Sequence, residues 1–506
     1  MPVITDRVPI CVGTGFARMI RSLPRRAPSP RSAVVFFHIT DSLPTRQSIR
    51  SGRRHLGVNC DKLLSMVGTA DAYAAYDDDV RQTQIAAINE RFQEQVDRIK
   101  LVKLRAADAD ITEVTELADV VPLLLPHTAY KSYPEAFLID KKWDRLTKWL
   151  GTVSAHPTDA VDLSAVAEID DWVAACGAAG LHVSCSSGTT GKSAMLVSSQ
   201  QDLDFAARDG VAAVEWGSDM RVGDMRTAAG AAGAVAYTPR NLAMGMALMG
   251  AFVDPAAPRF NSGLPPVTIG SMTKMITLRK AIADGTAKPG EIAEFEAESA
   301  RRQEGLDAAQ AGSVEDIIAK REQKLYITGM WGSLYPLAEA VRARGYSSKD
   351  FNPENGVYLG GGLKRAQLPD DYREFVYETF NLQPRFIFQM YGMQEINTTI
   401  PRCQEGHRYH LPAWLVAIPL NKEGDALVAE NVGSATEARA AFFDLSMDGR
   451  WGGVISGDRV QIDFTPCVCG NASPSIKDDI ARYADLEGDD KIGCAGTVDA
   501  YVRGLT

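Results

Sequence analysis

One segment constrains the fold of this chain more than any other: a short apolar run that ends in a loop of glycine and hydroxyl residues. The run spans 181–185, and the loop reads SSGTTGKS over 186–193. A buried strand commonly leads into such a loop. The glycines let backbone N–H groups turn inward, the hydroxyls add donors and Lys192 adds a cation, so the loop can bind a polyphosphate. The alternative is a flexible surface loop. A nucleoside-triphosphatase P-loop is excluded, because that pattern requires glycine at the position of Ser186.

Elsewhere, strands alternate with helices, which predicts an α/β fold of layered sheets and helices. Three apolar strand segments run into glycines or a loop, at 325–328, 357–359 and 386–390. Helical periodicity covers 334–344, between the first two. Beyond Pro412 the pattern changes to short strands and turns, at 415–418, 426–428, 453–455 and 460–462. We therefore expect a β-rich subdomain beside the layered sheets.

Two longer segments have the three-to-four-residue apolar spacing that is typical of helices. One spans 70–105. The other spans 281–324 and is rich in alanine and charged residues. Gly285, a Pro-Gly pair at 289–290 and Gly312 are expected to interrupt it, because glycine and proline weaken helices.

The charge is unevenly distributed along the 506 residues. The net charge of −10 argues against a general nucleic-acid binder, which would present a basic face. Residues 1–60 contain ten arginines and two aspartates, a net +8, so the rest of the chain carries −18. An arginine- and serine-rich leader with few acids is typical of a transit peptide, or of a mis-assigned start. We expect a leader at 1–65, one large domain at 66–475 and a short C-terminal stub at 476–506.

The most apolar stretch, 228–253, is broken by Pro239 and Arg240. Neither half approaches the ~20 residues of a membrane-spanning helix. We therefore expect no membrane span and a cytoplasmic protein.

The loop at 186–193 resembles the phosphate-loop signature of the adenylate-forming superfamily, whose members couple ATP to a carboxylic acid. The resemblance implies that superfamily's large N-terminal domain, with layered sheets, helices and a β-rich subdomain. It also implies that the loop binds the ATP phosphates through Ser186, Ser187, Gly188, Thr189, Thr190, Gly191 and Lys192.

A second block, YGMQE at 391–395, resembles the superfamily's Y-G-x-T-E block. By resemblance, Tyr391 would stack on adenine beside Gly392, and Glu395 would hold Mg²⁺. Aromatic stacking and a carboxylate suit these two roles. Gln394 stands where the superfamily has a threonine that contacts the α-phosphate, so this contact would be made by an amide N–H.

Two further matches follow in the order of the superfamily. SGDRV at 456–460 resembles its S/T-G-D block, which implies that Asp458 accepts hydrogen bonds from the ribose hydroxyls. Arg482 stands where the hinge arginine would lie.

Three other stretches point to the LuxE-type branch, the acyl-protein synthetases that deliver acyl groups to a fatty-acid reductase. They are PLLLPHTAYKS at 122–132, GGGLK at 360–364 and GCA at 493–495. The resemblance places Gly360, Gly361 and Gly362 in the nucleotide site and makes Cys494 the acyl acceptor. A thiolate is a suitable nucleophile for this transfer. Most adenylate-forming ligases have a C-terminal domain, which is expected to be truncated here. Lys192, Lys364 and Mg²⁺ would therefore neutralise the phosphate charge.

Three hypotheses about the function stay open. In the first, a fatty or aromatic carboxylic acid is activated to acyl-AMP and passed to a protein thiol, either Cys494 or a cysteine of a partner reductase or carrier. In the second, the acceptor is coenzyme A, as in phenylacetate-CoA ligases. In the third, the chain is a non-catalytic nucleotide-binding scaffold of the same fold.

A set of cysteines and one histidine forms a second candidate site. Cys467 and Cys469 form a C-x-C-G motif, and Cys403 and His410 lie upstream. Phenylacetate-CoA-ligase-like members have similar patches. Three thiolates and one imidazole make a closed tetrahedral zinc site. The alternative is a pair of reduced thiols in a turn.

Overall fold

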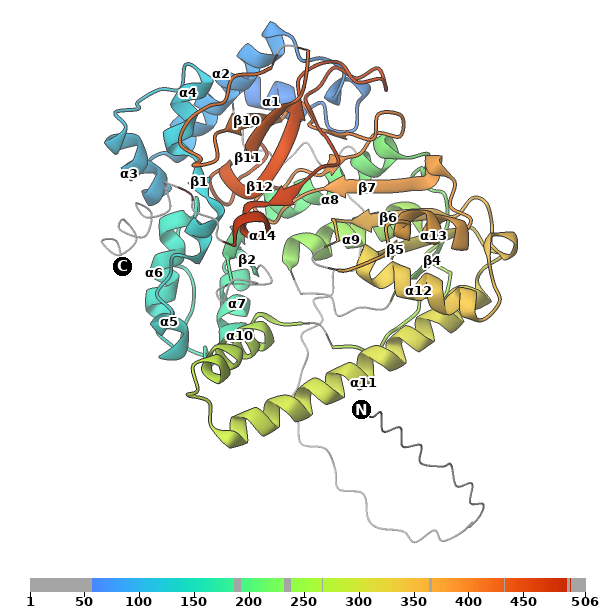
Figure 1. Ribbon diagram of the computed structural model, residues 1–506. Helices are drawn as coiled ribbons and strands as arrows, with labels where there is room; N and C mark the ends of the chain where they lie inside the picture. Colours follow the sequence, from blue (N-terminus) through green and yellow to red (C-terminus); the bar gives the residue numbers. More distant parts are fainter. Residues whose placement is uncertain are drawn as a thin grey trace, which may run out of the picture. The chain divides into compact units, whose positions relative to one another are not determined.

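A five-stranded sheet forms the centre of the 227–401 part of the chain (Figure 1). Its strands lie in the order β4 (Thr227–Gly230), β5 (Leu325–Gly329), β6 (Gly356–Gly360), β7 (Ile387–Tyr391) and β8 (Ile400–Pro401). The first four strands are parallel, and β8 is antiparallel to β7. Side chains alternate between two covered faces, as expected where helices pack on both sides. Ile327 and Val357 point to one face, and Tyr326 and Phe388 point to the other.

The computed structural model describes residues 57–185, 193–231, 238–265, 267–363, 366–431, 433–488 and Ile492. The strands in these residues are β1 (Leu125–Pro126), β2 (His182–Cys185), β3 (Met195–Ser198), β4 (Thr227–Gly230), β5 (Leu325–Gly329), β6 (Gly356–Gly360), β7 (Ile387–Tyr391), β8 (Ile400–Pro401), β9 (Tyr409–His410), β10 (Leu415–Leu420), β11 (Thr436–Asp444), β12 (Gly453–Asp463), β13 (Ser475–Ile476) and β14 (Ala481–Arg482). The α-helices are α1 (Val58–Leu64), α2 (Asp78–Gln95), α3 (Lys100–Asp108), α4 (Leu117–Val120), α5 (Ala136–Ile139), α6 (Trp143–Val153), α7 (Ile169–Ala178), α8 (Gln200–Gly217), α9 (Pro239–Phe252), α10 (Ile269–Ala283), α11 (Pro289–Ala319), α12 (Trp331–Ala343), α13 (Tyr372–Thr379) and α14 (Tyr483–Glu487).

Helices cover both faces of the parallel sheet. Helices α8 and α9 bury Val214 and Leu248 against Tyr326 and Phe388. Helices α11, α12 and α13 cover the opposite face, which carries Ile327. This arrangement confirms the expected α/β class with layered sheets and helices.

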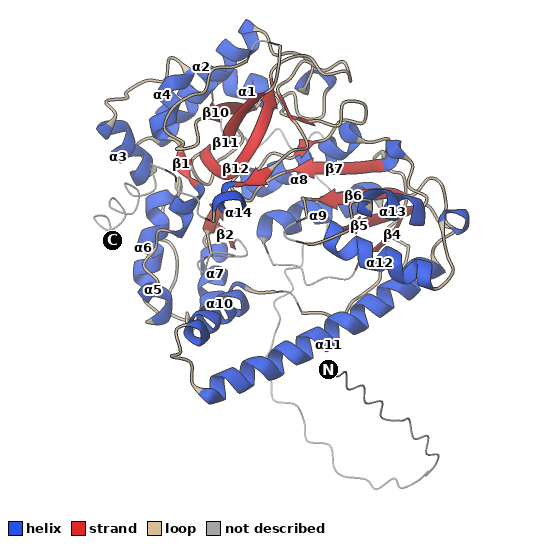
Figure 2. Cartoon of the chain, in the orientation of Figure 1, coloured by secondary structure: helices blue, strands red, loops and turns tan. Residues whose placement is uncertain are grey.

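A second, mainly antiparallel sheet follows the first in sequence (strands red in Figure 2). Its path is β10–β11–β12–β13–β9, with β1 parallel to β12 and β14 antiparallel to β12. A buried cluster joins the two sheets, because Tyr391 at the end of β7 packs with Phe442 of β11 and Val460 of β12. The β-rich part expected beyond Pro412 is therefore confirmed, and it contacts the parallel sheet where β7 ends.

Strands β2 and β3 form an antiparallel hairpin, in which Cys185 pairs with Met195. The candidate phosphate loop at 186–192 connects them and lies outside the described residues.

Several strand expectations beyond Pro412 are wrong in detail. The segments 453–455 and 460–462 belong to one continuous strand, β12, which contains Gly457. The segment 426–428 forms only an isolated bridge between Leu420 and Leu427. Strand β11 was not expected, because it combines charged and small residues with a late aromatic pair, although it is almost entirely buried.

The helix boundaries also differ. The 70–105 segment is divided into α2 and α3, whereas α11 passes through Gly312 without a break. A Cβ at Gly312 would lie 2.9 Å from the ring of Phe260, so this glycine allows close packing and does not end the helix. Helix α1 lies within the range expected as leader, yet Cys60 and Leu63 are buried in the core. None of the described helices is long and apolar enough to cross a membrane.

Candidate functional site

Three residues from separate sequence blocks meet where β7 reaches the antiparallel sheet. Tyr391 ends β7, Asp458 lies in β12, and Arg482 of β14 is the register partner of Asp458. The Tyr391 hydroxyl donates to Asp458 Oδ2 at 2.7 Å, and Arg482 Nε lies 3.6 Å from Asp458 Oδ1. The structure thus brings together the three residues for which the resemblance implies adenine, ribose and hinge roles.

The environment of Asp458 shifts the pKa of its carboxyl upward. Burial raises the pKa of this carboxyl, although the hydrogen bond from Tyr391 and the charge of Arg482 act in the opposite direction. Arg482 itself is largely exposed, with 63% of its side chain accessible. An oxygen of Asp458 that accepts a hydrogen bond from a protein hydroxyl can also accept one from a ribose hydroxyl.

Gln394 is anchored through both its side chain and its backbone. Its Nε2 donates to Oδ1 of Asn241 at 3.1 Å, near the start of α9. Its carbonyl accepts a hydrogen bond from Nη2 of Arg450 at 2.8 Å. The amide therefore connects this block to α9, a contact that no pattern in the sequence predicts.

The edges of the phosphate loop are held by the segment that begins near Pro122. Tyr133 follows the His127–Lys131 turn, and its hydroxyl donates to the carbonyl of Ser193 at 2.8 Å. The loop residues Ser186, Ser187, Gly188, Thr189, Thr190, Gly191 and Lys192 lie outside the described residues, as do Lys364 and Cys494. Their predicted roles stay predictions.

The glycines at 360–362 follow the strand beside β7. Gly360 ends β6 and is the register partner of Met390, which precedes Tyr391. Gly361 has φ +88°, a backbone conformation that favours glycine. The first glycine of this block thus lies next to the block that contains Tyr391, Gly392 and Glu395.

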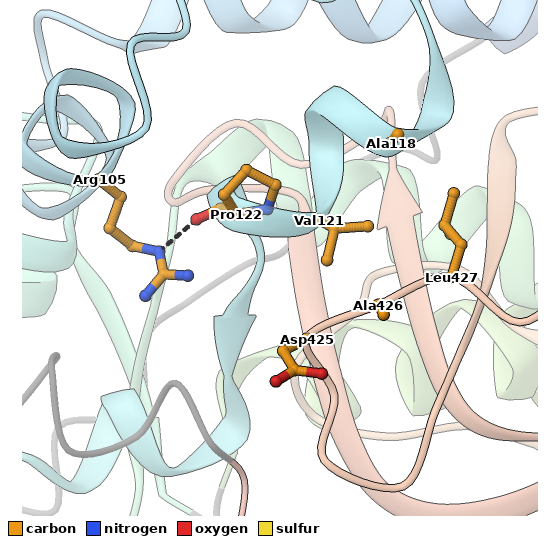
Figure 3. A pocket seen from close by; sticks show the side chains of 7 residues that line it. All are labelled: Arg105, Ala118, Val121, Pro122, Asp425, Ala426 and Leu427. Carbon is orange, nitrogen blue, oxygen red and sulfur yellow. Dashed lines mark hydrogen bonds between the residues drawn. The ribbon is translucent and has the colours of Figure 1, made fainter.

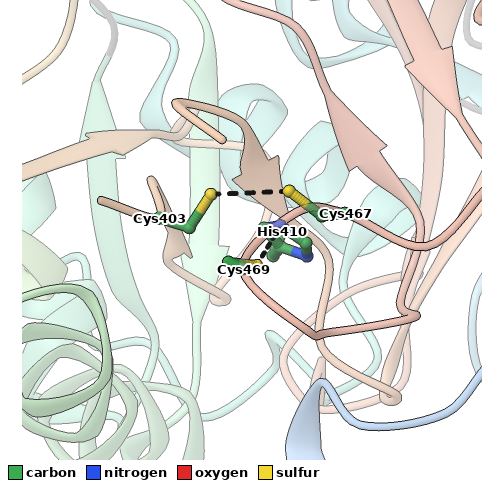
Figure 4. Close-up of side chains that lie close together, drawn as sticks. All are labelled: Cys403, His410, Cys467 and Cys469. Atoms are coloured by element: carbon green, nitrogen blue, oxygen red, sulfur yellow. Dashed lines mark hydrogen bonds between the residues drawn. The ribbon is translucent and has the colours of Figure 1, made fainter. Parts of the chain in front are cut away.

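The second candidate site is fully assembled by the fold (Figure 4). The ligand atoms of Cys403, His410, Cys467 and Cys469 lie within 4.8 Å of one another. Cys403 follows β8, His410 lies in β9, and the C-x-C pair lies in the turn after β12. These residues are separated by as many as 66 positions, and the antiparallel pairing of β9 with β13, with the bridge between Arg402 and Tyr409, brings them together.

Two donor separations in this cluster match the edges of a zinc tetrahedron. The Sγ atoms of Cys403 and Cys467 are 3.8 Å apart, and Cys469 Sγ is 3.5 Å from His410 Nε2. Zn–S bonds of about 2.3 Å and Zn–N bonds of about 2.0 Å give tetrahedral edges of about 3.8 Å and 3.5 Å. The other ring nitrogen of His410 is hydrogen bonded to Ser473 Oγ at 3.0 Å, the kind of contact that orients a metal-binding imidazole.

Burial affects two of these groups strongly. It raises the pKa of Cys403 to about 12 and lowers the pKa of His410 to about 4. A neutral imidazole is the form that binds a metal, whereas a buried thiol without a metal holds its proton. The donor set therefore suits a cation that replaces the thiol protons.

An open pocket of about 530 Å³ lies elsewhere, between η3 (Val121–Leu123) and the turn that follows β10 (Figure 3). It is lined by Arg105, Ala118, Val121, Pro122, Asp425, Ala426 and Leu427. Arg105 Nε donates to the carbonyl of Pro122 at 2.7 Å. None of the predicted site residues lines this pocket, and Arg105 and Asp425 are the charged residues of its lining.

No family model matches the sequence, and no curated protein matches it. Solved structures of a 2-hydroxyisobutyryl-CoA ligase do match. One, in complex with 2-HIB-AMP and CoA in the thioesterification state, is 12% identical over 81% of this chain and 70% of that chain, with a TM-score of 0.48. Another, in the postadenylation state with R3-HIB-AMP, is 12% identical over 80% of this chain and 68% of that chain, with a TM-score of 0.46. Similarity at this level concerns the path of the chain only and indicates no activity.

Proposed function

We propose that the protein activates a carboxylic acid with ATP and Mg²⁺, giving acyl-AMP and pyrophosphate, and then transfers the acyl group to a thiol. The observation that carries this proposal is the contact of Tyr391, Asp458 and Arg482. These residues come from separate blocks whose order resembles that of the adenylate-forming superfamily.

The first half-reaction needs binding and charge neutralisation more than covalent participation. Tyr391 would stack on adenine, and Asp458 would accept hydrogen bonds from the ribose. Glu395 would hold Mg²⁺, which, when bound, neutralises phosphate charge. Lys192 and Lys364 would add positive charge. A carboxylate oxygen of the substrate attacks the α-phosphorus, and the bond to pyrophosphate breaks.

The second half-reaction needs a reactive thiol, and Cys494 is our candidate. The thiolate attacks the acyl carbonyl, a thioester forms and AMP leaves with the electron pair of the broken bond. Cys60 and Cys176 are poor alternatives, because both are buried and burial raises their pKa to about 12. A thiol of a partner reductase or carrier, and coenzyme A, are the other acceptors under this proposal.

ATP–pyrophosphate exchange over a panel of fatty and aromatic acids tests the first half-reaction. We expect exchange with at least one acid, because adenylation is reversible and needs no thiol. If no acid supports exchange while the protein still binds ATP tightly, the hypothesis of a non-catalytic nucleotide-binding scaffold replaces this proposal.

A Cys494→Ser variant tests the acceptor. We expect exchange to continue, because the variant leaves adenylation intact, and a radiolabelled acyl group to disappear from the protein. Cys176→Ala, which removes a buried thiol, is the control and should keep the label. Unchanged labelling of Cys494→Ser would remove this residue from the mechanism. Formation of acyl-CoA when CoA is added would favour coenzyme A as the acceptor.

We also propose that Cys403, His410, Cys467 and Cys469 bind one structural zinc ion. The supporting observation is the agreement of two donor separations with the edges of a zinc tetrahedron. Elemental analysis of the purified protein should find one zinc per chain. A protein that contains no zinc after expression in zinc-supplemented medium would contradict the assignment.

A further inference from the structure

Several charged side chains form hydrogen bonds with the backbone on both sides of Glu395. Buried side chains from four other segments hold the polar groups of residues 394–399, which we name the anchored segment. The bonds are Arg450 Nη2 to Gln394 O (2.8 Å), Arg240 Nη2 to Asn397 O (2.8 Å), Asn397 N and Thr398 N to Asp444 Oδ2 (2.8 and 2.9 Å), Thr399 N to Asp209 Oδ2 (2.6 Å) and Asn397 Nδ2 to Asp202 Oδ1 (2.7 Å). Hydrogen bonds to charged groups are stronger than neutral ones, so this backbone is rigidly positioned.

Arg450 also contacts the strand that leaves the phosphate loop. Its Nη1 donates to the carbonyl of Val197 at 2.6 Å and lies 3.2 Å from Ser198 Oγ, both in β3. Its Nη2 donates to Gln394, next to Glu395. One guanidinium therefore connects the phosphate-loop hairpin with the block that would hold Mg²⁺.

The charge of Arg450 is not matched by an ion pair within the described part of the chain. The side chain is completely buried, its hydrogen bonds go to two carbonyls and a hydroxyl, its guanidinium lies 5.9 Å from the ring centroid of Tyr130, and its Nε has no hydrogen-bond partner. Burying a charge without a counterion is costly, and such groups are frequently functional.

Arg240 adds a second buried cation nearby. Burial lowers the pKa of its guanidinium, and the next largest influence is repulsion from Arg450. Asp444 and Asp209 offset this repulsion in part. Two neighbouring guanidiniums and the side chains of Asp202, Asp209 and Asp444 thus form one buried polar network around the anchored segment.

We propose that Arg450 is a positioning residue for the nucleotide: it fixes the phosphate-loop hairpin relative to Gln394 and Glu395. This inference rests on the proposed ATP site. It assigns to an arginine in an unremarkable sequence context a role that the motifs alone do not contain.

The test compares Arg450→Gln and Arg450→Lys with a matched control, Arg226→Gln. Arg226 is also completely buried and also donates to backbone carbonyls, those of Leu325 and Glu354, but it contacts neither the hairpin nor the anchored segment. Circular dichroism first establishes that each variant is folded. The dissociation constant for Mg-ATP is then measured by calorimetry, and KM for ATP and kcat are measured by pyrophosphate exchange.

Arg450→Gln should weaken ATP binding about tenfold to a hundredfold, the equivalent of one or two charge-assisted hydrogen bonds. Arg450→Lys should recover part of the affinity because its ammonium can still donate to one of the two carbonyls, yet have a lower kcat because one ammonium cannot bridge Val197 and Gln394. Arg226→Gln should lose stability but keep the wild-type affinity for ATP.

Wild-type affinity in folded Arg450→Gln would overturn the inference, whether or not the protein turns over. If that variant does not fold, Arg450→Lys decides: wild-type values of both KM and kcat would overturn the positioning role. Failure of the proposed function looks different, because wild-type protein would then show no exchange with any acid. If wild-type protein also fails to bind Mg-ATP, both proposals are wrong.

Discussion

At the scale of single residues, Asp209 shows how the charges around the anchored segment are tuned. It is buried and accepts a hydrogen bond from the N–H of Thr399. Burial raises the pKa of this carboxyl to about 7, with a further contribution from Asp444 and opposition from the Thr399 hydrogen bond and Arg240. Asp209 is therefore the acid of this group that changes its charge near neutral pH.

The raised pKa gives a testable pH dependence. Between about pH 4, where an aspartate titrates in the unfolded chain, and about pH 7, the folded state binds a proton that the unfolded state has lost. The contribution of Asp209 to the free energy of unfolding therefore falls as pH rises, by at most about 1.4 kcal/mol per pH unit. An Asp209→Asn variant keeps an acceptor for Thr399 and has no carboxyl to ionise.

We predict that Asp209→Asn gains stability relative to wild type as pH is raised from 5 to 8. Urea unfolding at both pH values measures this difference, and other titrating groups largely cancel because they are present in both proteins. A difference that does not change with pH would show that Asp209 ionises normally in the folded state.

At the scale of elements, short linear patterns were more informative than long-range pairing. The C-x-C motif and the upstream cysteine and histidine could be identified because ligand chemistry is visible in residue type. Strand β11 and the bridging role of Arg450 could not, since both depend on partners far away in sequence: Arg450 contacts Val197, 253 positions earlier. The expected helix break at Gly312 is wrong for the same reason, because its neighbour Phe260 lies outside the helix.

The turn between Cys403 and His410 gives a prediction at this scale. A Cβ at Gly406 would overlap Sγ of Cys467, one of the proposed zinc ligands. Gly406→Ala should therefore lower zinc content and the midpoint of thermal unfolding. Gly245→Ala in α9 is the control, because no atom lies within 4 Å of its added Cβ, and it should keep zinc and be stabilised by about 0.5–1 kcal/mol. Equal zinc content in the two variants would contradict the proposed ligand geometry.

At the scale of the whole molecule, the α/β class, the layered sheets and the β-rich part follow from the sequence pattern, and the structure confirms them. The assembly of the candidate site depends on the junction of the two sheets. There the end of β7 meets β12 and β14, so that Tyr391, Asp458 and Arg482, which lie within a 92-residue span, come together at one point. The proposed adenylation makes this junction the nucleotide site.

ATP–pyrophosphate exchange in wild type, Asp458→Asn and Asp463→Asn tests this claim most directly. Asp463 lies in the same strand as Asp458 and is paired with Arg408, away from Tyr391. We predict exchange in wild type with at least one acid, similar exchange in Asp463→Asn, and a KM for ATP raised about tenfold or more in Asp458→Asn, because a charged acceptor for the ribose is lost. No exchange in wild type with any acid, or an unchanged KM in Asp458→Asn, would contradict the account.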